Sequence, residues 1–221
     1  MADNSSTVFQ YADKPRGYFE GARHDIVAAL PHNPQATILE IGCGNGATGI
    51  AAKAEGRCAR YIGVELAPGP AQLARTKLDQ VILGDVEILD WSRIPTPVDV
   101  VILSEVLEHL VDPWVVVNKA YKLLREGGKI FASSPNIASM SVLMALLRGQ
   151  FDYQEAGVMD RTHLRWFTPL TYSAMFEDAG FDTISIGPLA PLRWKWRAVS
   201  KLLAGRFKHL GANQIMYVGQ K

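Results

Sequence analysis

The sequence predicts an α/β fold with a doubly wound, mostly parallel seven-stranded sheet. Short apolar runs alternate with segments of helical apolar spacing, which is the order of strand–helix–strand units. The runs are continuously apolar, as is typical of parallel strands covered on both faces. The first run, Thr37–Ile41, leads directly into a glycine-rich turn and a helical segment. Together these observations predict one sheet with right-handed crossovers.

The elements of the first part are expected in a regular order. Strands are expected at Thr37–Ile41, Arg60–Glu65, Gln80–Leu83, Val98–Ser104 and Lys129–Ser133. Helices are expected at Gly17–Leu30, Ala47–Ala54, Gly69–Leu78 and Pro113–Leu124. The first helix has Phe19, Ile26 and Leu30 at helical spacing and stops at Pro31.

The later part of the chain is less regular. An apolar helical run at Ile137–Leu147 precedes a polar and aromatic loop at Gln150–Thr168. A helix at Pro169–Ala179 ends at Gly180, a residue that favours helix termination. Two further strands are expected at Thr183–Gly187 and Gln214–Gly219.

No stretch rich in proline, glycine or serine divides the chain, so we expect one domain over residues 1–221. Within it we expect an N-terminal helix at 15–31 and a lid or substrate-recognition insertion at 137–168. A basic segment at 188–213 precedes the last strand.

Charge is distributed unevenly along the chain. The total is +1, but the residues after Asp182 contain seven lysines and arginines and no acid, which leaves −6 on the first 182 residues. Residues 193–208 combine basic and aromatic side chains. They could contact a membrane surface, bind an acidic substrate or pack on the acidic body. Nucleic-acid binding is not expected of an otherwise acidic chain, and the sequence leaves the oligomeric state open.

The expected setting is the cytoplasm, peripheral to the membrane if residues 193–208 bind its surface. Two cysteines, one of them inside the glycine turn at Cys43, favour a reducing compartment. No secretion signal is visible, and no apolar run approaches the ~20 residues of a membrane span.

The glycine turn after the first strand predicts a nucleotide-like cofactor, because glycines let backbone approach a ligand closely. Two interpretations compete. Gly44–Gly49 fits the G-x-G-x-x-G pattern of NAD-binding oxidoreductases and epimerases. The same residues fit E-x-G-x-G-x-G from Glu40 to Gly46. A carboxylate at Glu40 would favour a cofactor with ammonium and sulfonium groups over a pyrophosphate.

Five motifs in order resemble those of class I S-adenosylmethionine-dependent methyltransferases. They are Leu39–Gly46, Tyr61–Leu66, Gly84–Val86, Asp99–Leu110 and Leu123–Ile130. The likeness covers roughly residues 17–187 and implies a Rossmann-like methyltransferase fold with an antiparallel last strand. A non-catalytic binding module that retains this fold is a further alternative.

The resemblance implies a set of residues for S-adenosyl-L-methionine. Glu65 would accept hydrogen bonds from the ribose hydroxyls, Asp85 from the adenine amino group, and the Val86 N–H would donate to the ring. The remaining cofactor residues are Glu40, Gly42, Gly44, Gly46, Leu66, Ser104 and Glu105.

Catalytic candidates come from two places. Asp160–Thr168 packs titratable and aromatic residues together and resembles a pattern in methyltransferases of cell-surface sugar or quinone pathways. His163 is a candidate base for removing a hydroxyl proton, with Asp160 orienting it. His109 is a further candidate. Each of the three could instead stabilise its loop or the core. No metal site is expected. The predicted reaction is O-methylation of a small molecule or of a glycan or lipid-linked precursor.

Overall fold

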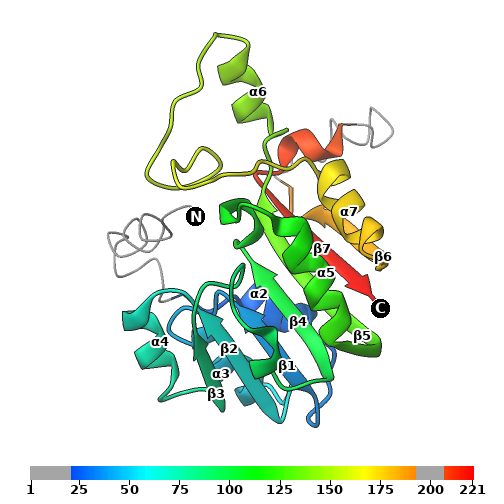
Figure 1. The fold of residues 1–221 in the computed structure, drawn as a ribbon. Coiled ribbons are helices and arrows are strands. Elements are labelled where there is room, and N and C mark those ends of the chain that lie inside the picture. The colour runs from blue at the N-terminus through cyan, green and yellow to red at the C-terminus, as the bar shows by residue number, and fades with distance from the viewer. Residues whose placement is uncertain (1–20, 193–206) are drawn as a thin grey trace. The chain divides into compact units, whose positions relative to one another are not determined.

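The computed structural model describes residues 21–192 and 207–221, which contain seven strands in one sheet. The strand order is β3-β2-β1-β4-β5-β7-β6 (Figure 1). Parallel pairs join β1 to β2 and β4, and β2 to β3, whereas β6 and β7 are antiparallel. The predicted fold class is therefore confirmed, including its antiparallel last strand.

The chain forms two compact units. Of the described residues, the first contains 21–103 and 122–129, and the second contains 104–121, 130–192 and 207–221. The single domain expected from the sequence stays a prediction.

Four strands begin and end where the sequence predicted them. They are β1 (Thr37–Ile41), β2 (Arg60–Glu65), β3 (Gln80–Leu83) and β4 (Val98–Ser104). Leu39 of β1 lies between Ile62 and Val101 on the neighbouring strands, and all three are buried. Consecutive residues of β1, β2 and β4 are buried, so both faces of these strands are covered, which explains why they carry no polar alternation.

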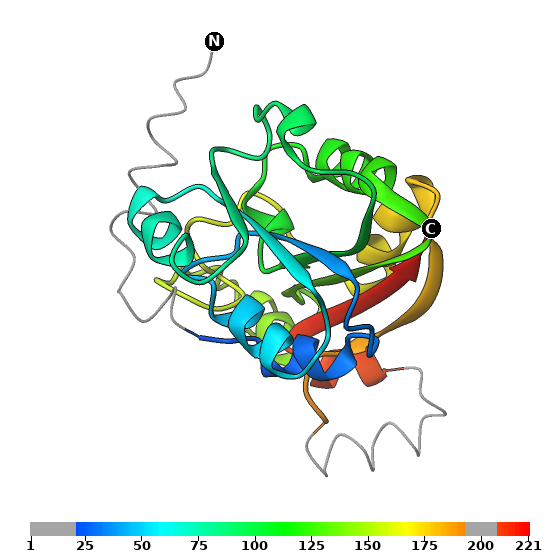
Figure 2. The same ribbon diagram turned by 90° about the horizontal axis from the view of Figure 1, so that it is seen from below.

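The helices of the first unit are shorter than or equal to the expected ones. They are α2 (His24–Ala29), α3 (Ala47–Ala54) and α4 (Pro68–Ala74), with a 3-10 turn, η2, at Trp91–Arg93. Figure 2 shows α2 beside α3. Helix α4 ends four residues before the predicted Leu78. The backbone turns there, and the Leu78 side chain packs against Gly46 and Gly49.

The second unit contains the remaining elements. They are η3 (Leu107–His109), α6 (Met140–Leu146), α7 (Pro169–Asp178), β6 (Asp182–Pro188), η4 (Lys208–Gly211) and β7 (Gln214–Gln220). Two elements, α5 (Pro113–Leu123) and β5 (Leu124–Pro135), run through both units. Helix α7 packs on β6 and β7, and the Phe176 ring stacks on Tyr217 with centroids 4.0 Å apart.

The predicted lid region contains one short helix and a long loop. Helix α6 begins at Met140 and not at Ile137, because the Asn136 side chain accepts the Ala138 N–H and holds a turn there. In Figure 1, α6 and the loop after it extend away from α7, β6 and β7. Isolated bridges join Gln154 to Asp160 and Asn136 to Phe167.

Most of the predicted basic segment, residues 193–206, lies outside the described residues. Among the helices that the structure does describe, none is long and apolar enough to cross a membrane.

Candidate functional site

The glycine turn between β1 and α3 is left-handed at each of its three glycines. The φ angles are 76° at Gly42, 53° at Gly44 and 81° at Gly46. Residues with a Cβ rarely adopt this left-handed backbone conformation. Gly46 is also the residue from which α3 starts. The turn thus presents bare backbone at the carboxyl end of β1, where open α/β sheets bind ligands.

Glu65 holds this turn from the end of β2. Its carboxylate is buried and accepts two backbone hydrogen bonds, from Gly44 at 2.8 Å and from Ala67 at 2.8 Å. Burial raises the pKa of Glu65, although these backbone donors oppose that shift. Each carboxylate oxygen has a second lone pair, so the group can hold the turn and still accept hydrogen bonds from a ligand.

Glu40 lies inside β1 and is 2% exposed. Its carboxylate accepts a hydrogen bond from the Tyr61 hydroxyl at 2.9 Å. Burial raises the pKa of Glu40 to about 7, in spite of hydrogen bonds from Tyr61 and Thr48 and the charge of Arg23. A positively charged ligand group within reach would therefore favour the ionised form of Glu40. The sequence did not single out Tyr61 as its partner.

The third predicted contact segment follows β3. The Gly84 N–H donates to the Glu65 carbonyl at 3.0 Å, so this segment is tied to the end of β2. Asp85 accepts the Glu87 N–H at 2.9 Å and forms a tight turn, while Val86 is buried. Leu66 is half-buried. The first unit thus brings the glycine turn, Glu65 and the Asp85 turn to one edge of its sheet.

Ser104 and Glu105, the last two predicted cofactor residues, belong to the second unit. Glu105 has a φ of 53° and is the one non-glycine residue with positive φ among those described. Its carboxylate accepts hydrogen bonds from Ser133 at 2.7 Å and Gln214 at 3.1 Å. Ser104 lies 3.4 Å from the Ser133 hydroxyl. Backbone strain of this kind concentrates at functional sites.

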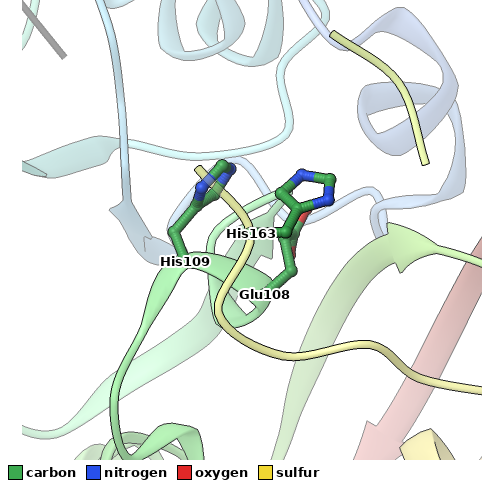
Figure 3. Close-up of side chains that lie close together, drawn as sticks. All are labelled: Glu108, His109 and His163. Carbon is green, nitrogen blue, oxygen red and sulfur yellow. The ribbon is translucent and has the colours of Figure 1, made fainter. Parts of the chain in front are cut away.

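The catalytic candidates His109 and His163 meet in the second unit, together with Glu108. Figure 3 shows Glu108 and His109 on η3 and His163 on the long loop. The two imidazole centroids are 4.7 Å apart, and all three side chains are buried. The loop is fixed against η3 because the N–H groups of Leu164 and Arg165 donate to the Glu108 carbonyl.

Asp160 contacts this cluster through a residue that the sequence did not single out. Its carboxylate accepts the Thr162 N–H at 2.9 Å and the Thr162 hydroxyl at 2.7 Å. The Thr162 carbonyl in turn lies 3.2 Å from His109 Nδ1. His163 Nδ1 lies 3.1 Å from the Val158 carbonyl. That Asp160 orients His163 stays a prediction, and the structure adds a connection from Asp160 to His109.

Comparison with known proteins identifies the family of this chain. The sequence profile of a methyltransferase-domain family matches residues 16–186. Because this match covers most of the chain, the chain belongs to that methyltransferase family. The class of enzyme, a methyltransferase, is confirmed at the level of the family. The family decides against the NAD-dependent interpretation of Gly44–Gly49.

Individual relatives are distant. A ubiquinone biosynthesis O-methyltransferase of Xylella fastidiosa is 25% identical and matches 84% of this chain and 76% of its own length. The ubiquinone biosynthesis O-methyltransferase of Pseudomonas paraeruginosa is 26% identical over 68% of this chain and 66% of its own length. A solved S-adenosylmethionine-dependent methyltransferase from Archaeoglobus fulgidus superposes on this chain with a TM-score of 0.66 and 21% sequence identity. The superposition covers 93% of this chain and 97% of the Archaeoglobus chain. That likeness supports the fold.

Proposed function

We propose that this methyltransferase transfers the methyl group of S-adenosylmethionine to a hydroxyl oxygen of a small molecule or of a glycan or lipid-linked precursor. The observation that carries this proposal is the buried group of His109, His163 and Glu108. A hydroxyl acceptor requires removal of a proton, which imidazoles can support near neutral pH. Two of the relatives described above are named O-methyltransferases, which supports transfer to oxygen.

In this proposal the first unit holds most of the cofactor. The Glu65 carboxylate accepts hydrogen bonds from both ribose hydroxyls, and Asp85 and Val86 bind the adenine. The glycine turn and Glu40 face the methionine part, with its positive charges. Leu66, Ser104 and Glu105 complete the predicted cofactor residues.

The reaction is an in-line displacement at the methyl carbon. The bond from carbon to the acceptor oxygen forms as the bond from carbon to sulfur breaks, which yields a methyl ether, S-adenosylhomocysteine and a proton. Sulfonium is a good leaving group, so the protein mainly aligns the reactants and removes the hydroxyl proton. His163 and His109 are the candidate groups for this proton transfer.

The test is methyl transfer from a donor with a deuterated methyl group to a panel of phenols, catechols and sugars, with the products analysed by mass spectrometry. We expect a labelled methyl ether from at least one hydroxyl acceptor. Products labelled only on nitrogen or carbon would contradict the proposal, and so would binding of S-adenosylhomocysteine without any transfer across the panel.

The role of His163 is tested by His163→Ala. We expect turnover to fall by about 10²–10⁴-fold, the typical contribution of acid–base catalysis. Affinity for S-adenosylhomocysteine should stay nearly the same. His32→Ala, which removes an exposed imidazole of the first unit, is the matched control and should retain full turnover. Equal turnover of the His163 and His32 variants would refute the assignment.

A further inference from the structure

We infer that Glu108, His109 and His163 form a binding site for a divalent transition metal ion of the Zn²⁺ or Mn²⁺ type. Each residue offers one ligand atom, and these atoms all lie within 4.8 Å of one another. Four tetrahedral ligands about 2.1 Å from Zn²⁺ are roughly 3.4 Å apart, so modest side-chain rotations would close the set around an ion. Figure 3 shows the three side chains gathered from η3 and the loop.

The surroundings of both imidazoles favour coordination through Nε2. His109 Nδ1 lies 3.2 Å from the Thr162 carbonyl, and His163 Nδ1 lies 3.1 Å from the Val158 carbonyl. When Nδ1–H donates to a carbonyl, the lone pair resides on Nε2. A backbone carbonyl on the far nitrogen is one of the common partners of a metal-bound histidine, and it fixes the tautomer and the ring orientation.

The burial of the three side chains and the charge of Glu108 also favour a metal ion at this site. Glu108 is 1% exposed and both histidines are 6% exposed. A carboxylate removed from water is costly unless positive charge lies close to it. A divalent ion bound between Glu108 and the two imidazoles would place positive charge directly beside this carboxylate.

The backbone around the three residues is already fixed. The N–H groups of Leu164 and Arg165 both donate to the Glu108 carbonyl, at 2.8 and 2.9 Å. Thr162, which precedes His163, is held by the Asp160 carboxylate. Such support lowers the conformational cost of assembling the ligands when the ion binds.

The ligand set also limits which ion fits. Two imidazoles and one carboxylate suit zinc, manganese or iron, whereas calcium and magnesium prefer oxygen ligands throughout. Three protein ligands leave coordination positions for an oxygen of another molecule.

The role of the ion rests on the proposed function. An acceptor hydroxyl bound to the metal loses its proton to solvent more readily, because the ion stabilises the resulting oxyanion. With the ion bound, His163 and His109 act by holding the metal, in place of the direct proton transfer that the proposed function assigns to them. Bond formation to the methyl carbon proceeds as described above.

The experiment uses the full chain after treatment with a chelator. Titration with Co²⁺, followed by its visible absorption, and with Zn²⁺ and Mn²⁺ by calorimetry should give one ion per chain. His163→Ala, His109→Ala and Glu108→Gln should each weaken affinity at least tenfold. His24→Ala, which removes an exposed imidazole, should leave affinity unchanged. Retained binding of S-adenosylhomocysteine shows that each variant is folded.

The outcomes separate this inference from the proposed function. Lack of a bound ion, or equal affinity in the His163 and His24 variants, would overturn the metal site. If methyl ethers still formed in chelator, the proposed function would stand with an imidazole base. If the ion bound at these residues but no hydroxyl acceptor were methylated, the metal site would stand and the proposed function would fail.

Discussion

Burial raises the pKa of both Glu40 and Glu65, but the two carboxylates have different hydrogen-bond partners. Glu65 accepts two backbone hydrogen bonds, which offset part of the cost of removing its charge from water. Glu40 has a tyrosine hydroxyl as a partner, and its pKa rises to about 7. In our proposal each carboxylate gains a ligand partner when the cofactor binds.

Glu65→Gln should weaken binding of S-adenosylhomocysteine by more than tenfold. Hydrogen bonds to a charged group contribute about 1.5–3 kcal/mol each, and the amide keeps the shape but loses the charge and one acceptor. Calorimetry measures the affinity. Glu55→Gln, which neutralises an exposed carboxylate of the same unit, is the control. The ribose role would be excluded by an unchanged affinity.

Glu40→Gln should remove part of the pH dependence of the unfolding free energy of the ligand-free protein. The charged and titratable groups that influence Glu40 are Tyr61, Arg23, Glu65 and Cys43. The pKa of Glu40 rises from an ordinary 4.5 to about 7 on folding. Between these values only the folded protein holds the proton, so the contribution of this group to stability falls as pH rises.

Below pH 4.5 the Glu40 carboxyl is neutral in both the folded and the unfolded protein. Above pH 7 it is charged in both, so the full free-energy cost of burying its charge remains there. At 1.36 kcal/mol per pKa unit the change is on the order of 3 kcal/mol. Urea unfolding of both proteins from pH 5 to 8 measures it. The expected result is a flatter curve for the variant, and parallel curves would show that Glu40 does not titrate in this range.

At the scale of elements, the packing of α3 on β2 depends on a missing side chain. Gly49 is buried within α3, and a Cβ there would meet the Leu78 side chain and lie 2.7 Å from the Tyr61 ring. The absence of a Cβ at Gly49 lets α3 approach the sheet closely, directly after the glycine turn. Gly49 therefore serves the packing of α3, whereas cofactor binding by Gly44 and Gly46 belongs to our proposal.

Gly49→Ala should destabilise the protein by about 1–3 kcal/mol, the usual cost of overpacking a core. Gly69→Ala in α4 is the matched control, since nothing lies within 4 Å of its added Cβ. Alanine is also the better helix former, so this variant should be neutral or slightly stabilised. Midpoints of urea unfolding measure both. A Gly49 variant as stable as the Gly69 variant would contradict the close packing.

At the scale of the whole molecule, the candidate residues are divided between the two compact units. Glu40, the glycine turn, Glu65 and Asp85 lie in the first unit, and the cluster of Glu108, His109 and His163 lies in the second. The proposed function assigns most cofactor contacts to the first unit and the hydroxyl chemistry to the second.

Hydrogen exchange measured by mass spectrometry tests this division. S-adenosylhomocysteine should slow amide exchange in residues 42–48 and 65–67, because ligand binding suppresses local opening around its site. Exchange in β6 and β7 should stay the same. Protection confined to β6 and β7 would refute the assignment of the cofactor to the first unit.

The sequence predicted the fold closely where local signals and burial agree. Strands β1 to β4 match their expected bounds because continuous apolar runs end at charged or glycine residues. The predicted end of α4 and the predicted start of α6 were wrong, because contacts that the local apolar spacing does not reveal set these boundaries. The Leu78 side chain packs beside Gly49, and the Asn136 side chain holds a turn before α6.

The sequence by itself determined the α/β class, the glycine turn and the family, because strand burial and turn geometry are encoded in neighbouring residues. Only the tertiary structure decided which side chains meet. Thr162 is 53 residues from His109, and no local pattern records that the loop places its carbonyl and the His163 ring against η3. Long-range backbone hydrogen bonds to Glu108 create that contact, and with it the three-residue cluster that the sequence did not predict as a metal site.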